Sequence, residues 1–177
     1  MATSSATDVW ETLAAEAAAE SPLWGEQLRD EPEREGVFGP LAPERFMLGL
    51  ETIYEGYLVH YGRPRLFSPS EGDVALLLGD YLYAHGLVRI ADHHVVDAVA
   101  DLAELISICA QVRAEGRSDD GPAWAASAAL LGDGVLTNAR QAFREEASSV
   151  ALLSLARGAV GEAAVERALQ AHLARVG

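Results

Sequence analysis

The chain has 177 residues, half of them apolar, and a formal net charge of −14 at pH 7. This acidic balance argues against nucleic acid and anionic membranes as partners, because both bind basic surfaces. Lysine does not occur, which excludes a phosphate-loop lysine, a Schiff-base lysine and a lysine general base.

The composition is rich in alanine and poor in β-branched clusters, which predicts an all-helical protein. The length predicts one domain over residues 1–177. The single cysteine, Cys109, is expected to be a buried apolar residue, which fits a reducing cytoplasm. No signal peptide is expected, and no apolar run reaches the roughly 20 residues that span a bilayer. We therefore expect a cytoplasmic protein without an integral membrane segment.

The first third of the chain predicts two helices and a linker. Residues 1–6 are expected to be disordered, a helix is predicted at about 8–20, and Ser21 with Pro22 begins a second, short helix. Residues 29–42 are charged and rich in proline and glycine, so they predict a surface linker. Three apolar residues of this linker are expected to pack back on the core: Val37, Phe38 and Leu41.

A long helix is predicted from Pro43 to about Tyr61, and a second long helix follows within residues 60–91. Ser70 is expected to cap this second helix, with Asp73 three residues later. The second helix is apolar nearly all round, which is typical of the middle of a bundle. Its expected inward stripe is Val74, Leu77, Leu78, Tyr81, Leu82 and Val88.

Glycines recur every seven residues on both predicted long helices. Gly72, Gly79 and Gly86 leave one side of the second helix bare, and Gly49 and Gly56 do the same on the first. We expect these glycines to mark a close helix contact. The remaining helices are predicted at 93–115, with Asp92 as its cap, and at 122–132, 135–157 and 161–175.

The run Gly62-Arg-Pro followed by Val74-Ala-Leu-Leu-Leu-Gly-Asp-Tyr-Leu82 resembles the trans-polyprenyl diphosphate synthases, whose helices carry R-G-x-P-T and then A-x-L-x-G-D-Y-L. The run from Glu51 to His60 is similar to the E-x-x-H-x-x-x-L-x-H of that family. The resemblance covers about residues 45–112. It implies an all-α helical bundle built like part of the isoprenoid synthase fold.

The chain departs from the family wherever the family places its chemistry. After His60, where the first aspartate-rich motif should begin, the sequence reads Tyr61-Gly-Arg-Pro64, and no second aspartate-rich motif follows. The chain also spans about half the family's usual length. Ionising an allylic diphosphate requires Mg²⁺ held by two facing aspartate clusters. We therefore expect no catalytic residue, no metal site and no cofactor, and no prenyl transfer by this chain alone.

The resemblance implies a non-catalytic accessory subunit in isoprenoid metabolism, either a homodimer or a heteromer with a catalytic polyprenyl synthase. The expected interface residues are Gly72, Gly79, Gly86 and Tyr83. The alternative is a module that binds an isoprenoid or another lipid in a tunnel lined by Tyr54, Tyr57, Tyr81 and Phe67. The candidate substrate-binding residues are Arg63, Arg65, Tyr54, Tyr57 and Tyr81.

A third hypothesis is a metal-dependent enzyme. Four polar residues, spaced three to four apart, share one face of the helix predicted at 93–115: His94, Asp97, Asp101 and Glu104. Glu51 and Glu55 likewise share a face of an earlier helix. Such faces are more typical of a solvated surface than of a metal site. We therefore expect these carboxylates to be solvated and idle.

Overall fold

The computed structural model describes residues 6–176, and within this range the chain forms helices and no β-strand. The predicted all-α class is confirmed. Residues 1–5 lie outside the described range, and Ala6, the last residue of the segment expected to be disordered, already belongs to the first helix. The helices are α1 (Ala6–Glu20), α2 (Pro22–Gly25), η1 (Gly39–Leu41), α3 (Glu44–Tyr61), α4 (Gly72–Ala91), α5 (Val96–Ala114), α6 (Gly121–Ala129), α7 (Thr137–Glu146), α8 (Val150–Val160) and α9 (Glu162–Val176).

Several predicted boundaries need correction. The N-cap of α4 is Glu71 instead of Ser70, and it makes no side-chain capping bond. The N-cap of α5 is Val95 instead of Asp92. The single helix predicted at 135–157 is two helices, because Ala147 adopts a left-handed conformation with φ 55° and ends α7. By contrast, Ser21 caps α2 as predicted, its side chain accepting a hydrogen bond from the Leu23 amide.

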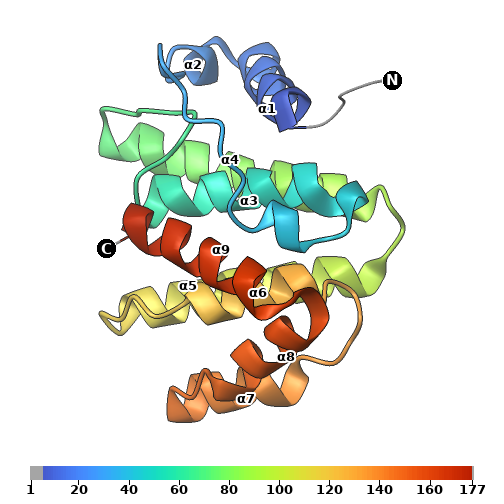
Figure 1. Cartoon of the computed structure of the whole chain (residues 1–177). Coiled ribbons are helices and arrows are strands. Elements are labelled where there is room, and N and C mark those ends of the chain that lie inside the picture. The colour runs from blue at the N-terminus through green and yellow to red at the C-terminus, as the bar shows by residue number, and fades with distance from the viewer. Residues whose placement is uncertain (1–5, 177) are drawn as a thin grey trace.

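Helix α3 is the buried centre of the molecule, and α4 lies antiparallel beside it (Figure 1). Gly56 and Gly49 of α3 face Gly79 and Gly86 of α4 as predicted, whereas the prediction of a close contact at Gly72 is wrong, because that residue has open space around it. A Cβ atom on Gly56 would lie 2.9 Å from the carbonyl oxygen of Gly79, and a Cβ atom on Gly86 would lie 2.8 Å from that of Gly49. Any larger side chain at these positions would push the two backbones apart.

The prediction that α4 is a central helix is wrong. Residues 51–58 of α3 are all buried, whereas α4 is covered by α3 and α1 on two sides and exposed on a third. Leu77 and Val88, which were predicted to point inward, are 56% and 58% exposed. An apolar surface all round a helix indicates contacts on every side, but here only some of those contacts are made within the chain.

The remaining helices lie on both sides of the α3–α4 pair, α1 and α2 on one side and α5 to α9 on the other (Figure 1). Helices α5, α6, α8 and α9 share the main core with α3, and α6 is buried along most of its length. Helix α1 covers a smaller apolar cluster on the middle of α4, which includes Leu78 and Leu82. The 29–42 segment is more than a surface linker. Val37, Phe38 and Leu41 are buried as expected, and they belong to the main core.

By length and composition, one helix of the described chain, α4, is apolar enough to cross a membrane. This corrects the expectation that no segment is long enough. A single helix of this kind is equally typical of a packed helix in a soluble protein. Helix α4 also carries Asp73, Asp80 and Arg89, and two of its glycines, Gly79 and Gly86, pack against α3. These features are compatible with the expected absence of an integral membrane segment.

Candidate functional site

A fully buried arginine, Arg65, lies at the junction of α3 and the loop that leads to α4. Its Nη1 donates to Glu51 at 2.5 Å and its Nε to Glu55 at 2.9 Å. The rings of Trp10 and Tyr54 lie over its guanidinium, with centroids 4.5 and 4.9 Å away. Burial opposes the charge, but the two carboxylates outweigh it and raise the pKa of Arg65 above its ordinary value.

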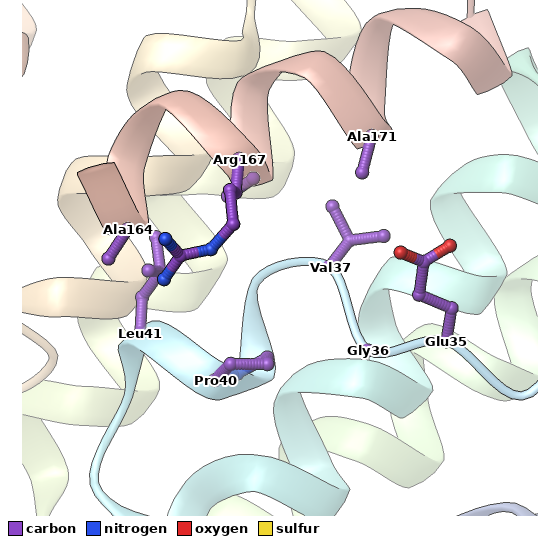
Figure 2. Close-up of a pocket in the computed structure, with 9 residues that line it drawn as sticks. Glu35, Gly36, Val37, Pro40, Leu41, Ala164, Arg167 and Ala171 are labelled. Atoms are coloured by element: carbon purple, nitrogen blue, oxygen red, sulfur yellow. The ribbon is translucent and has the colours of Figure 1, made fainter. Parts of the chain in front are cut away.

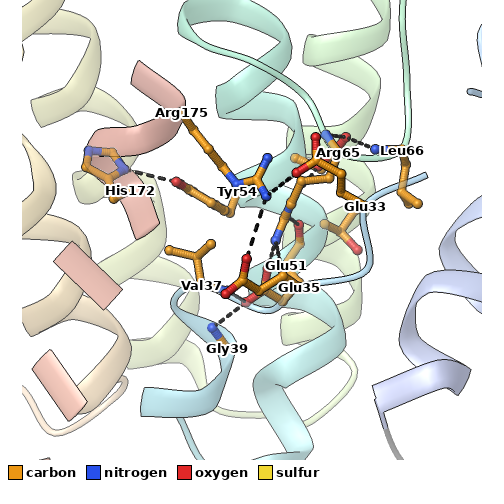
Figure 3. A network of polar contacts seen from close by, with 12 residues as sticks. Glu33, Glu35, Val37, Gly39, Glu51, Tyr54, Arg65, Leu66, His172 and Arg175 are labelled. Carbon is orange, nitrogen blue, oxygen red and sulfur yellow. Dashed lines mark hydrogen bonds and ion pairs between the residues drawn. The ribbon is translucent and has the colours of Figure 1, made fainter. Parts of the chain in front are cut away.

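The two glutamates also hold two loops in place (Figure 3). Glu51 accepts hydrogen bonds from the amides of residues 37 and 39, at 3.0 and 2.6 Å, and Glu55 accepts from the amides of residues 65 and 66, at 2.8 and 2.7 Å. The expectation that Glu51 and Glu55 are solvated is therefore wrong. Arg65 was a candidate substrate-binding residue, but it is enclosed and serves to hold the fold together.

A second polar network is centred on Asp120, just before α6. Its carboxylate accepts a hydrogen bond from the Tyr57 hydroxyl at 2.7 Å and lies 3.2 Å from both His172 and Arg113. The Tyr54 hydroxyl lies 3.0 Å from the other nitrogen of His172. Burial acts to raise the pKa of Asp120, but the hydrogen bonds of His172 and Tyr57 and the charge of Arg113 outweigh it and lower that pKa. Both ring nitrogens of His172 are thus engaged.

The aromatic residues of the predicted lipid tunnel do not line one space. Tyr54 and Tyr57 are fully buried in the main core, stacked with ring centroids 5.8 Å apart and both in contact with Trp124. Phe67 and Tyr81 belong to the separate cluster beneath α1. Burial raises the pKa of both Tyr54 and Tyr57, so these phenols stay protonated. They fill the interior.

Arg63, the other candidate substrate-binding arginine, is exposed and caps α9. Its amide donates to the carbonyl of Arg175 at 3.0 Å, and its Nη2 donates to the carbonyl of Ala174 at 3.1 Å. A cation at a helix C-terminus is stabilised by the helix dipole, which accounts for this placement.

The acidic face of α5 is divided between ion pairs and solvent. Asp101 is buried, and its carboxylate binds Arg140 at 2.6 Å and the amide of Gly132 at 2.8 Å. Glu104 pairs with Arg144 at 3.1 Å, while Asp97 is exposed. The expectation that this face is solvated is therefore wrong for Asp101. Among the side chains that the structure describes, no three histidine, cysteine or acidic residues gather where they could hold a metal ion.

The surface has shallow cavities around α9. One of about 170 Å³ lies between residues 35–41 and α9, beside Arg167 (Figure 2). It adjoins a polar cavity of about 420 Å³ at Arg175, where the Arg175 guanidinium pairs with Glu33 at 2.9 Å. A third, mostly apolar cavity of about 230 Å³ borders His172 and Leu173. Apart from Arg63, which borders the polar cavity, none of the predicted substrate-binding residues lines these three spaces.

The outer face of α4 is the clearest candidate for a functional surface. We define it by the exposed residues that share one side of the helix: Asp73, Leu76, Leu77, Asp80, Ala84, Val88 and Ala91. Leu76, Leu77 and Val88 are each more than half exposed. Large apolar side chains gathered on one helix face are typical of an interaction site.

The predicted interface residues lie elsewhere on α4. Gly79 and Gly86 are buried against α3 within the same chain, so they are not exposed for a contact with a second chain. A Cβ atom on Gly79 would lie 2.4 Å from the ring of His60, which also contacts Tyr83 with centroids 5.1 Å apart. Gly72 has open space around it. Sequence reasoning missed the outer face because it assigned Leu77 and Val88 to the core stripe. The sequence does carry a signal for this face, because α4 also has large apolar residues on the side opposite the glycines that face α3.

No protein-family model, no curated protein and no solved structure matches this chain. The resemblance to the polyprenyl diphosphate synthases therefore rests on the sequence motifs of α3, of the loop that follows it and of α4.

Proposed function

We propose that this chain is a non-catalytic helical subunit that acts by binding a partner protein through the outer face of α4. The observation that carries the proposal is the exposure of Leu76, Leu77 and Val88 on a helix otherwise packed against its own chain. Burying one such side chain contributes roughly 1.5–3 kcal/mol, so a partner covering all three would gain substantially.

The carboxylate clusters support a non-catalytic role. Asp101 and Glu104 form ion pairs with arginines. Glu51 and Glu55 form ion pairs with Arg65 and accept hydrogen bonds from backbone amides. A carboxylate that is already neutralised and enclosed is a poor ligand for Mg²⁺, which requires open oxygen ligands. The described residues thus offer no substitute for the aspartate-rich motifs that the sequence lacks.

The motif resemblance suggests the partner. Residues 45–112 comprise nearly all of α3, α4 and α5, so the segment that resembles the synthases includes the outer face. We infer that the partner is a catalytic polyprenyl diphosphate synthase and that this chain modulates it, for example by helping to set product length.

Co-purification with a full-length synthase from the same genome tests the proposal. We expect the wild-type chain to be retained on the synthase and the Leu77→Ser/Val88→Ser variant to be lost. A matched control is Val96→Ser/Val150→Ser, since these valines are 79% and 74% exposed on other helices. A wild-type chain that stays monomeric and ignores the synthase would contradict the proposal. Equal loss in both variants would show that the effect is not specific to α4.

The lipid-binding alternative has one supporting observation, the apolar cavity of about 230 Å³ beside His172 and Leu173. Its volume is below the roughly 300–1,000 Å³ of typical ligand pockets. Leu169 lines this cavity, so Leu169→Asp would place a charge in its wall. A fluorescent fatty acid that binds the wild type but not this variant would favour lipid binding. The geometry supports partner binding better.

A further inference from the structure

The outer face of α4 combines apolar side chains with two carboxylates. Asp73 and Asp80 are seven residues apart, so they lie on one line two turns apart, with Leu76 and Leu77 between them. Neither carboxylate has an arginine partner among the described ion pairs. Asp80 is 65% exposed and lies 3.3 Å from His60.

The charge of Asp80 is not cancelled by His60. Burial lowers the pKa of this histidine, so its imidazole is neutral at pH 7. The one arginine of α4, Arg89, lies on another side of the helix, where Glu16 of α1 binds it. The outer face is therefore purely anionic and apolar. A partner that covers it buries two carboxylates and must supply cations, because burying a charge without a counter-charge is strongly unfavourable.

A second copy of this chain does not meet that requirement. Its own outer face has no cationic residue, so an α4–α4 contact leaves Asp73 and Asp80 without counter-charges in either orientation. The net charge of −14 adds long-range repulsion between two copies. Both features favour a basic partner over self-association.

Building on the proposed function, we propose that the outer face of α4 binds a basic amphipathic helix of the partner protein. The bound helix carries two arginines or lysines about seven residues apart, facing Asp73 and Asp80, and apolar residues three or four positions from them that cover Leu77 and Val88. The 20 residues of α4 extend about 30 Å, which accommodates a partner helix of about five turns. The small side chains of Ala84 and Ala91 let that helix approach closely.

Selection of displayed helical peptides on the intact protein tests this proposal without assuming a partner. We expect enriched peptides to share paired cations at a spacing of seven and apolar residues between them. For the most enriched peptide, made synthetically, fluorescence anisotropy should show at least a tenfold loss of affinity for Asp73→Asn/Asp80→Asn. The control Asp97→Asn/Asp133→Asn, with the same charge change at exposed positions elsewhere, should bind within twofold of wild type. Binding should also weaken as salt is raised.

Enriched peptides without paired cations, no enrichment at all, or unchanged affinity for the aspartate variant would each overturn the proposal. Light scattering separates this failure from failure of the proposed function. A homodimer that Leu77→Ser dissociates would assign the outer face to a second copy and reject the basic helix. A monomer that binds neither peptide nor synthase would reject both.

Discussion

The close contact of α3 and α4 predicts an unusual response to a conservative substitution, Gly86→Ala. In an exposed helix interior, replacing glycine by alanine stabilises by about 0.5–1 kcal/mol. At Gly86 the new Cβ atom would lie 2.4 Å from Cγ1 of Ile53 and 2.8 Å from the carbonyl oxygen of Gly49. The second contact is with backbone, so relief requires α3 and α4 to separate. Overpacking of this kind costs about 1–3 kcal/mol.

We therefore expect Gly86→Ala to destabilise the protein by about 1–2 kcal/mol, lowering Tm by about 2–8 °C in a chain of this size. Circular dichroism melting measures this effect. The matched control is Gly158→Ala in α8, where a Cβ atom would meet nothing within 4 Å. That variant should melt at or above the wild-type temperature. If both variants melt alike, α3 and α4 do not approach as closely as described.

Four further outcomes follow from the same geometry. Asp101→Asn leaves the buried Arg140 without its counter-charge, so it should lower the free energy of unfolding, measured in urea, by about 3 kcal/mol. Asp97→Asn, at an exposed position, should change that free energy by no more than about 0.5 kcal/mol. Burial lowers the pKa of His60 in the folded protein, so as pH falls below about 6.5 the unfolded chain binds a proton before the folded chain does. The Tm should therefore fall with pH in this range, and His60→Gln should weaken this pH dependence. The thiol of Cys109 is buried and its pKa is raised well above the ordinary value, so a thiol reagent should modify it only as fast as the protein unfolds. With Mg²⁺ and a C15 allylic diphosphate, the purified chain should give no prenyl transfer above background, and EDTA-sensitive turnover would contradict this.

The helical class and the α3–α4 pairing could be predicted because both depend on periodic patterns. Gly49 and Gly56 match Gly79 and Gly86 through a spacing of seven that is visible in the sequence. The break between α7 and α8 could not be predicted in this way. Ala147 adopts a left-handed conformation that is usually found at glycine or asparagine. An alanine at this position gives no sign in the sequence that a helix ends here.

The buried ion pairs of Arg65 could not be predicted from the sequence for a different reason. Glu51 and Glu55 have helical spacing that is typical of a solvated face, and their partner, Arg65, lies beyond the end of the helix in an irregular loop. Periodicity carries no information about such a contact. It also cannot tell which apolar side of α4 faces inward, so Leu77 was assigned to the core although it belongs to the outer face.

The buried arginine limits how this protein can vary during evolution. A buried lysine can lose its proton, but the guanidinium of Arg65 stays charged at any physiological pH. Loss of Glu51 or Glu55 alone would leave that charge unpaired in the core, and replacing all three residues by apolar ones would leave the amides of residues 37, 39, 65 and 66 without acceptors. Among natural variants of this chain, the three residues should therefore be retained together. Sequences that keep Arg65 while losing either glutamate should be rare.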